Sequence, residues 1–183
     1  MDEALIVFLD RDGVINQDPP ADFVTNWTEF RFLPGAREAL RLLKQAGAKV
    51  VVVSNQSGIN RGIYAAEDLE EIDRRFKTAV SDSGGEITAS YYCPHRPDEG
   101  CACRKPGTGL IDQAVRELNL DLERSRAYLV GDRRTDIETG RRAGLVTILV
   151  LSGHTLLAGD ARDWPVPPDH TAPDLLGALN YIL

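Results

Sequence analysis

The sequence is short of cysteine, of long apolar runs and of positive charge, and each shortage excludes a class of protein. Only three of the 183 residues are cysteines, all between residues 93 and 103, which is too few and too clustered for a disulfide scaffold. No apolar run approaches the roughly 18 residues that a membrane-spanning helix requires. The acidic start, MDEALIVFLD, lacks the basic region of a secretory signal, so we expect a cytoplasmic protein.

Basic residues are outnumbered, with 21 Lys and Arg against 28 Asp and Glu and a net charge of −7. Nucleic-acid-binding proteins carry the opposite balance, so we expect neither nucleic acid nor membrane as a partner. An anionic ligand would need positive charge concentrated at one place. The length and the 43% hydrophobic content fit one globular domain over residues 1–183.

Apolar runs typical of buried strands alternate along the chain with helical patterns. This alternation predicts a Rossmann-like, three-layer α/β/α fold with a mostly parallel central sheet. No inserted segment is long enough to form a large cap domain, and the proline-rich segment 164–173 is expected to be an ordered surface loop. The expected strands are 5–10, 49–55, 89–94, 127–132 and 145–151, and the expected helices are about 34–47, 67–82, 110–118, 137–144 and 174–183.

Polar sequences follow three of these strands, as DRDG, SNQSG and GDRRTD. In a parallel sheet the ligand site lies outside the carboxyl ends of the strands. Residues two apart in an extended chain project to the same side, so Asp10 and Asp12 are expected to face one pocket and Arg11 to point away from them. Two such carboxylates favour a divalent cation, and oxygen ligands favour Mg²⁺. The alternative is an acidic turn in which Gly13 reverses the chain.

GDRRTD adds a second pair of carboxylates, Asp132 and Asp136. Asp132 comes just after a strand and is well placed to be another metal ligand. The alternative is a helix N-cap followed by a carboxylate in the first helical turn, which is common in proteins. Taken alone, this alternative is the stronger reading of the segment; the two aspartates of DRDG favour the metal site.

The segments SNQSGINRG and CRKP supply groups that suit an anion. Backbone N–H groups of a glycine-containing turn can surround a phosphate, and arginine can hold it with two hydrogen bonds. A polar loop and a solvated pair of basic residues are the alternatives. The candidate phosphate and substrate contacts are Ser54, Asn55, Gln56, Ser57, Arg61, Arg104 and Lys105.

The most specific local signal is CPHRPDEGCACRKP. Cys93, His95, Cys101 and Cys103 follow the pattern C-x-H and C-x-C with five residues between, as in a structural Cys₃His zinc site. All four zinc ligands come from the protein, so no open position remains for catalysis. We expect this zinc loop, residues 93–103, to direct Arg104 and Lys105 inward. The alternative is three reduced cysteines and an unrelated histidine.

DRDGVIN, the serine of SNQSG, the lysine of CRKP and the aspartates of GDRRTD resemble, in order, the four motifs of the haloacid dehalogenase (HAD) superfamily of phosphatases. With the zinc loop, the chain resembles the branch of histidinol-phosphatases and D-glycero-D-manno-heptose 1,7-bisphosphate 7-phosphatases. DGVIN and NQSGINRG are more similar to the heptose enzymes. The resemblance covers about residues 5–150 and implies an HAD-like fold.

The resemblance also implies roles for single residues. Asp10 would be the nucleophile that forms an aspartyl-phosphate, and Asp12 would protonate the leaving alcohol and then activate water. Ser54 and Lys105 would steady the phosphoryl group, and Arg104 would help to recognise the substrate. The implied Mg²⁺ ligands are the Asp10 carboxylate, the Asp12 backbone carbonyl, Asp132 and, in support, Asp136.

The expected activity is therefore a Mg²⁺-dependent hydrolysis of a small phosphorylated sugar by a monomer. The heptose bisphosphate would lose its 7-phosphate, in a step of nucleotide-activated heptose synthesis for lipopolysaccharide. The alternatives are a histidinol-phosphate phosphatase and, from another class, a zinc-binding module without catalysis. Without a cap domain, the zinc loop and the loops around residues 17–29 and 56–64 would shape the pocket.

Overall fold

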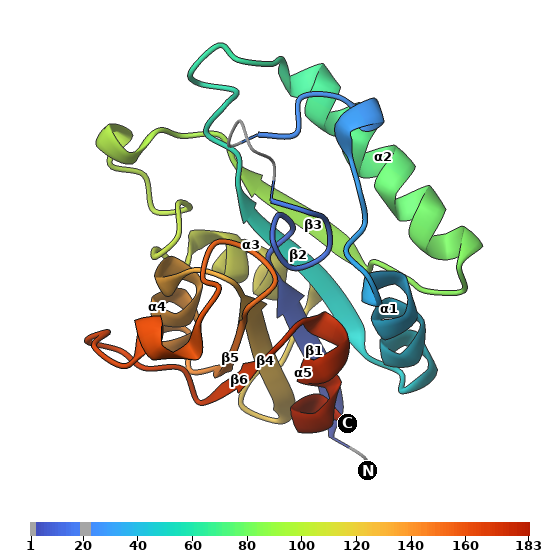
Figure 1. Ribbon diagram of the computed structural model, residues 1–183, viewed down its shortest axis with the longest axis vertical. Helices are drawn as coiled ribbons and strands as arrows, with labels where there is room; N and C mark the ends of the chain where they lie inside the picture. Colours follow the sequence, from blue (N-terminus) through green and yellow to red (C-terminus); the bar gives the residue numbers. More distant parts are fainter. Residues whose placement is uncertain (1–2, 19–22) are drawn as a thin grey trace.

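The computed structural model describes residues 3–18 and 23–183, and in this part a parallel sheet of six strands forms the centre (Figure 1). The strand order is β3-β2-β1-β4-β5-β6, with every neighbouring pair parallel. The strands are β1 (Ala4–Leu9), β2 (Lys49–Asn55), β3 (Ala89–Cys93), β4 (Ser125–Gly131), β5 (Val146–Val150) and β6 (His170–Ala172). The predicted three-layer α/β/α fold is confirmed.

Helices cover both faces of the sheet. Two faces need covering because strand residues alternate: Val7 and Leu9 of β1 belong to one buried cluster, and Ile6 and Phe8 to the other. This explains the continuous apolar runs, which are typical of strands buried on both sides. The helices on the first face are α1 (Ala36–Gln45), α2 (Ala66–Asp82) and α5 (Leu175–Ile182), and those on the second are α3 (Gly109–Leu118) and α4 (Arg134–Arg142).

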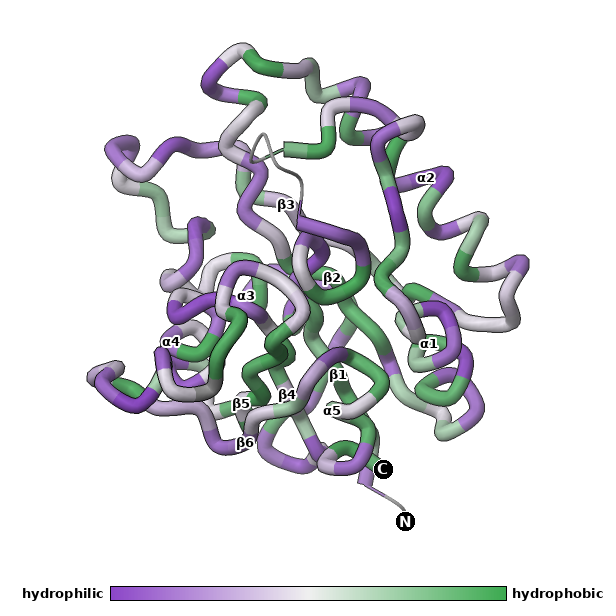
Figure 2. The backbone as a smooth tube through the Cα atoms, viewed as in Figure 1, coloured by the Kyte–Doolittle hydropathy of each residue, from purple (hydrophilic) through white to green (hydrophobic). Residues whose placement is uncertain are grey.

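The hydrophobic residues concentrate along the strands (Figure 2). Short 3₁₀ turns lie in the connections at Trp27–Glu29, Pro97–Glu99 and Ala158–Ala161. The start of β1 and the C-terminus lie at one end of the sheet, opposite the loops that follow β1 and β2 (Figure 1). Among the described residues, no helix is long and apolar enough to cross a membrane.

The register of the central strands determines where the motifs meet. Leu9, the last residue of β1, pairs with Val52 of β2 and with Val130 of β4. The polar segments that follow β1, β2 and β4 therefore leave three adjacent strands at the same edge, as their positions in the sequence predicted.

The structure differs from the predicted elements at β6, inside the segment 164–173 that we expected to be a loop. β6 pairs with β5, and Asp169 supports the pair by accepting hydrogen bonds from the backbone N–H and hydroxyl of Thr147, at 2.8 and 2.9 Å. Three residues, HTA, are too few to show the alternation by which a strand is recognised.

Candidate active site

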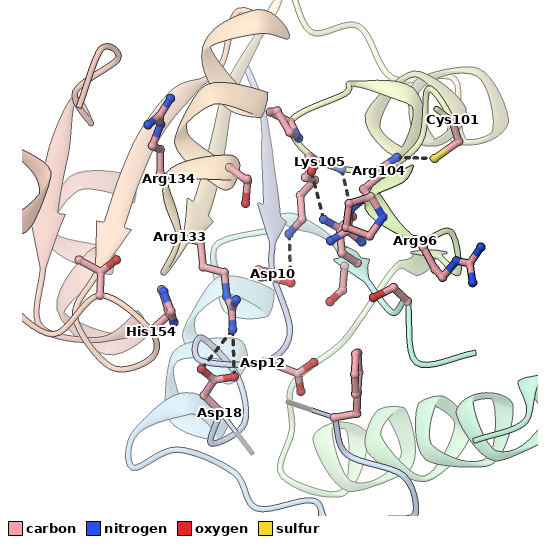
Figure 3. Close-up of a pocket in the computed structure, with 18 of the residues that line it drawn as sticks. Asp10, Asp12, Asp18, Arg96, Cys101, Arg104, Lys105, Arg133, Arg134 and His154 are labelled. Carbon is pink, nitrogen blue, oxygen red and sulfur yellow. Dashed lines mark hydrogen bonds and ion pairs between the residues drawn. The ribbon is translucent and has the colours of Figure 1, made fainter. Parts of the chain in front are cut away.

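A cavity of about 920 Å³ opens at the carboxyl ends of the strands, where the predicted motifs converge (Figure 3). Loops after β1, β2, β3, β4 and β5 all contribute side chains to its wall. The predicted site residues in that wall are Asp10, Asp12, Ser54, Asn55, Ser57, Arg61, Cys101, Arg104 and Lys105.

Lys105 forms the electrostatic centre of the site. Its ammonium group lies 3.1 Å from Asp10 Oδ1 and 2.5 Å from Asp136 Oδ1, and it donates a further hydrogen bond to the Val53 carbonyl at 2.9 Å. Lys105 is 3% exposed, so its charge is screened little by water. Removing one partner of such a buried pair costs about 3–5 kcal/mol, because it leaves a charge without compensation.

Asn55 holds the backbone that carries this lysine. Its side-chain oxygen accepts a hydrogen bond from the Lys105 N–H at 3.0 Å, and its amide donates one to the Lys105 carbonyl at 3.2 Å. These two bonds connect the end of β2 to the CRKP segment across 50 residues of sequence. Asn55 therefore positions Lys105, besides lining the cavity.

Asp10, Asp132 and Asp136 bring three carboxylates together, each offering an oxygen within 4.8 Å of the others. Burial, the first cause, and the negative charges of Asp136 and Asp12 raise the pKa of Asp10 to about 6, against the opposing effect of Lys105. Burial raises the pKa of Asp132 well above its usual value, and the other two carboxylates add to this. Asp132 Oδ1 is buried without a hydrogen-bond partner. Three oxygen donors and an unpartnered buried oxygen fit a hard divalent cation such as Mg²⁺.

Asp136 also begins α4. Its second oxygen, Oδ2, accepts a hydrogen bond from the Arg133 backbone N–H at 3.0 Å, in the geometry of a carboxylate three residues into a helix. Of the alternative that the sequence offered, the carboxylate in the first helical turn is therefore present, although the N-cap residue is Arg133 and not Asp132; the bond leaves Oδ1 of Asp136 for Lys105. One carboxylate serves both the helix and the site.

The Asp12 carboxylate lies apart from that cluster and is held by three donors. Asn16 Nδ2 donates to Oδ1 at 2.7 Å, Gln56 Nε2 donates to Oδ2 at 2.8 Å, and Arg11 Nη2 lies 3.2 Å from both oxygens. The expectation that Arg11 points away from the catalytic pair was wrong. β1 ends at Leu9, so the extended alternation from which that prediction was made does not reach residue 11.

Gln56 was expected to contact substrate, and the structure places it elsewhere. Its side chain is fully buried behind Asp12, where it also donates to Ser54 Oγ at 3.2 Å and accepts a hydrogen bond from the Tyr64 hydroxyl at 2.6 Å. Both ends of the amide are thus occupied within the protein. Gln56 supports Asp12 and Ser54 instead of lining the cavity.

Arginines supply the positive charge that the chain as a whole lacks. Arg104 donates from Nη1 to the His95 carbonyl at 3.1 Å, and Arg61 is exposed at the rim. The sequence reading did not single out Arg96 or Arg133, which also line the cavity. Figure 3 shows Arg133 reaching across to Asp18, with Nη2–Oδ2 at 3.3 Å. Residues 19–22 of the loop expected around 17–29 lie outside the described residues.

The loop after β5 is a second part of the site that the sequence reading missed. The His154 backbone N–H donates to Asp132 Oδ2 at 2.5 Å, and Ser152 Oγ donates to the Gly13 carbonyl at 2.8 Å. His154 is exposed and lines the cavity. The sequence contains a signal for this loop, because SGHT follows an apolar run as DRDG and SNQSG do.

The side chains of Cys93, His95, Cys101 and Cys103 converge on one point beside the cavity. Cys103 Sγ lies 3.1 Å from Cys93 Sγ, 3.5 Å from Cys101 Sγ and 3.2 Å from His95 Nδ1. A tetrahedral zinc with Zn–S bonds of about 2.3 Å needs sulfurs separated by about 3.8 Å, so small shifts would admit the ion. The Arg104 N–H lies 3.4 Å from Cys101 Sγ, which connects this cluster to the CRKP segment.

Two models of known protein families match the chain. The family model of haloacid dehalogenase-like hydrolases matches residues 7–121, and a second one, of HAD-hydrolase-like proteins, matches residues 102–178. The chain belongs to the haloacid dehalogenase-like hydrolases. The resemblance inferred from the four motifs is confirmed.

Within these hydrolases, the most similar proteins include heptose bisphosphate phosphatases. A D-glycero-D-manno-heptose-1,7-bisphosphate 7-phosphatase from Chlorobaculum tepidum is 36% identical over 194 residues, covering 100% of this chain and 96% of its own. A D-glycero-beta-D-manno-heptose-1,7-bisphosphate 7-phosphatase from Pseudomonas putida is 40% identical over 148 residues, covering 81% and 83%. The crystal structure of a Bordetella bronchiseptica D,D-heptose 1,7-bisphosphate phosphatase complexed with magnesium and phosphate superposes with a TM-score of 0.88, at 35% identity and 97% coverage of each chain.

Proposed function

We propose that this haloacid dehalogenase-like hydrolase removes the 7-phosphate of D-glycero-D-manno-heptose 1,7-bisphosphate through an aspartyl-phosphate. The observation that carries the proposal is the arrangement of Asp10. Its carboxylate faces the cavity beside the Lys105 ammonium, at 3.1 Å, and within 4.8 Å of the Asp132 and Asp136 oxygens. This arrangement supports Asp10 as the nucleophile in a site that would bind a phosphate dianion and a cation.

The first step is phosphoryl transfer to the protein. An oxygen of the Asp10 carboxylate attacks phosphorus, the bond between phosphorus and the ester oxygen breaks, and that oxygen takes a proton from Asp12 to leave as an alcohol. Lys105, with Ser54 beside it, offsets the negative charge of the transferring group. Asp10 acts in its ionised form, which the Lys105 charge favours.

The second step returns the enzyme to its starting state. Asp12, now a carboxylate, takes a proton from a water molecule whose oxygen attacks the phosphorus. The bond between phosphorus and Asp10 breaks, and inorganic phosphate leaves. Asp12 is on the cavity wall and is held from behind by Asn16 and Gln56, so one carboxylate can serve the leaving alcohol and then the water.

The metal assignment follows the same carboxylates. Asp10, Asp132 and Asp136 would hold Mg²⁺, with the Asp12 backbone carbonyl as a further ligand. When bound, the ion would offset the repulsion between these carboxylates and the incoming phosphate. Asp136 would act mostly in support, because one of its oxygens pairs with Lys105 and the other caps α4.

We further propose a structural Zn²⁺ at Cys93, His95, Cys101 and Cys103. His95 would bind it through Nδ1, the nitrogen that lies 3.5 Å from Cys93 Sγ and 3.2 Å from Cys103 Sγ. Because Arg104 and Lys105 directly follow Cys103, an ion there would hold both basic residues at the cavity. This role is structural, since the protein itself supplies all four ligands.

The substrate assignment rests on the relatives and on the charge of the cavity. Arg61, Arg96, Arg104 and Arg133 all line the cavity, so a molecule with two phosphate groups finds positive charge beyond the catalytic lysine. Histidinol phosphate carries one phosphate and a cationic amine and would use this charge less well. A zinc-binding module without catalysis would not need Asp10, Lys105 and Asp132 together. We also propose that the protein acts in the cytoplasm as a monomer, and that its reaction is a step of nucleotide-activated heptose synthesis for lipopolysaccharide.

The test is phosphate release from the heptose bisphosphate, followed by ³¹P NMR so that the 7- and 1-phosphates are distinguished. With the wild-type protein the signal of the 7-phosphate should disappear, and with Asp10→Asn it should persist. Asp121→Asn, which changes an exposed carboxylate at the opposite end of the sheet, is the matched control and should keep full activity. Turnover by Asp10→Asn at the wild-type rate would remove Asp10 as nucleophile.

A further inference from the structure

Arg11 is the largest fully buried side chain in the described part of the protein, at 0% exposure. It lies between the two aspartates of DRDG, and the catalytic scheme above gives it no part. A buried guanidinium is costly to desolvate unless the protein compensates it. Its surroundings therefore indicate what it is for.

The compensation comes from Asp12. Arg11 Nη2 lies 3.2 Å from both Asp12 oxygens, while Nε and Nη1 are buried without a hydrogen-bond partner. An arginine that served the fold alone would be expected to use its other donors on backbone carbonyls. Here the guanidinium is directed at one carboxylate.

Two aromatic rings hold the guanidinium in place. Its central carbon lies 5.7 Å from the centroid of the Tyr92 ring and 6.0 Å from that of Phe30, within the range of cation–π attraction. Tyr92 is itself anchored, because its hydroxyl donates to Asp73 Oδ1 at 2.6 Å. The cation thus has little freedom to follow a moving carboxylate, so it restrains Asp12.

We propose that Arg11 is a positioning residue that holds the Asp12 carboxylate in the orientation needed for proton transfer to the leaving oxygen. The inference rests on the proposed function, in which Asp12 is the acid and base. Asn16 and Gln56 bind one oxygen each, at 2.7 and 2.8 Å, and Arg11 fixes both oxygens at once. Loss of Arg11 would leave the carboxylate free to rotate between its two remaining donors.

Leaving-group dependence tests this role. Nitrophenolate leaves without a proton, whereas the alkoxide of glycerol phosphate needs one. Arg11→Met should lower kcat/KM for glycerol phosphate by about 10²-fold, which is the lower end of what general acid catalysis contributes. The same variant should lower kcat/KM for 4-nitrophenyl phosphate by less than about tenfold. Inhibition by inorganic phosphate should be unchanged. Arg37→Met is the matched control, because Arg37 is exposed and also lies over an aromatic ring, 5.4 Å from Phe32.

Arg11→Lys is the second variant, in case the methionine variant folds poorly. It keeps the charge but loses the planar group, so it should show a smaller loss with the same leaving-group dependence. Equal losses for both esters in the folded variant, or no loss, would overturn the proposal. If the wild-type protein hydrolyses neither ester nor the heptose bisphosphate, the phosphatase assignment itself fails, which is a different outcome.

Discussion

Gly153 lies directly against the carboxylate of Asp132. A methyl group on Gly153 would come within 2.3 Å of Asp132 Oδ2 and 2.6 Å of the Gly13 Cα. Gly13, at φ 81°, approaches the same carboxylate from the loop after β1. Two backbone segments from different strands therefore enclose one proposed metal ligand, leaving no room for a side chain on either.

Gly153→Ala should therefore displace Asp132 and weaken Mg²⁺ binding by about tenfold or more, the range seen when groups that orient metal ligands are changed. The measurement is the Mg²⁺ concentration that gives half-maximal activity, together with calorimetric titration. Gly159→Ala is the control, because a methyl group there meets nothing within 4 Å. An unchanged Mg²⁺ affinity in Gly153→Ala would contradict the proposed role of Asp132.

The stabilisation of the protein by Mg²⁺ should increase with pH. The pKa of Asp10 is raised from 3.8 to about 6 in the folded protein, so between these values the folded state binds more protons than the unfolded one. Without metal, stability is therefore lost as pH rises through that window. Mg²⁺ requires ionised ligands, so the gain in Tm should be small near pH 4 and should rise as the pH passes through about 6.

Thermal unfolding with and without Mg²⁺ across this range measures the effect. Asp132→Asn is the comparison variant and should show a much smaller gain at every pH. A gain that is independent of pH would mean that Mg²⁺ binds elsewhere.

Zinc should be present at about one ion per chain and should be lost in Cys103→Ser. With zinc at about 100 times its Kd the variant should lose about 3 kcal/mol of stability, which corresponds to a Tm lower by about 6–12 °C for a protein of this size. Phosphatase activity should fall as well, because Arg104 and Lys105 follow the changed residue. Metal analysis and thermal unfolding check both parts. His170→Gln, in a histidine that stacks on Tyr181 far along the chain, should keep the zinc; full zinc content in Cys103→Ser would refute the site.

The convergence of the proposed site residues was predictable because parallel strands end at one edge. Asp10, Ser54 and Asp132 each follow an apolar run, and the sheet order places those runs side by side. The cysteine cluster was predictable from spacing alone, because four candidate ligands within eleven residues must lie near one another.

The supporting residues were not predictable, because their partners are distant in sequence or their conformation is not regular. Gln56 meets Asp12 across 44 residues, and nothing local distinguishes it from a substrate contact. The Arg11 side chain contacts its neighbour Asp12. Because β1 ends at Leu9, the alternation of side chains along a strand does not apply to residue 11. β6 was missed because it has only three residues and owes its place to β5.

The most direct test of the central claim is a comparison of kcat/KM for D-glycero-D-manno-heptose 1,7-bisphosphate and for histidinol phosphate with the same Mg²⁺-saturated protein. The arginines around the cavity and the heptose-phosphatase relatives predict a higher value for the heptose bisphosphate, by about 10²-fold if the second phosphate contributes about 3 kcal/mol. An equal or higher value for histidinol phosphate would contradict the substrate assignment.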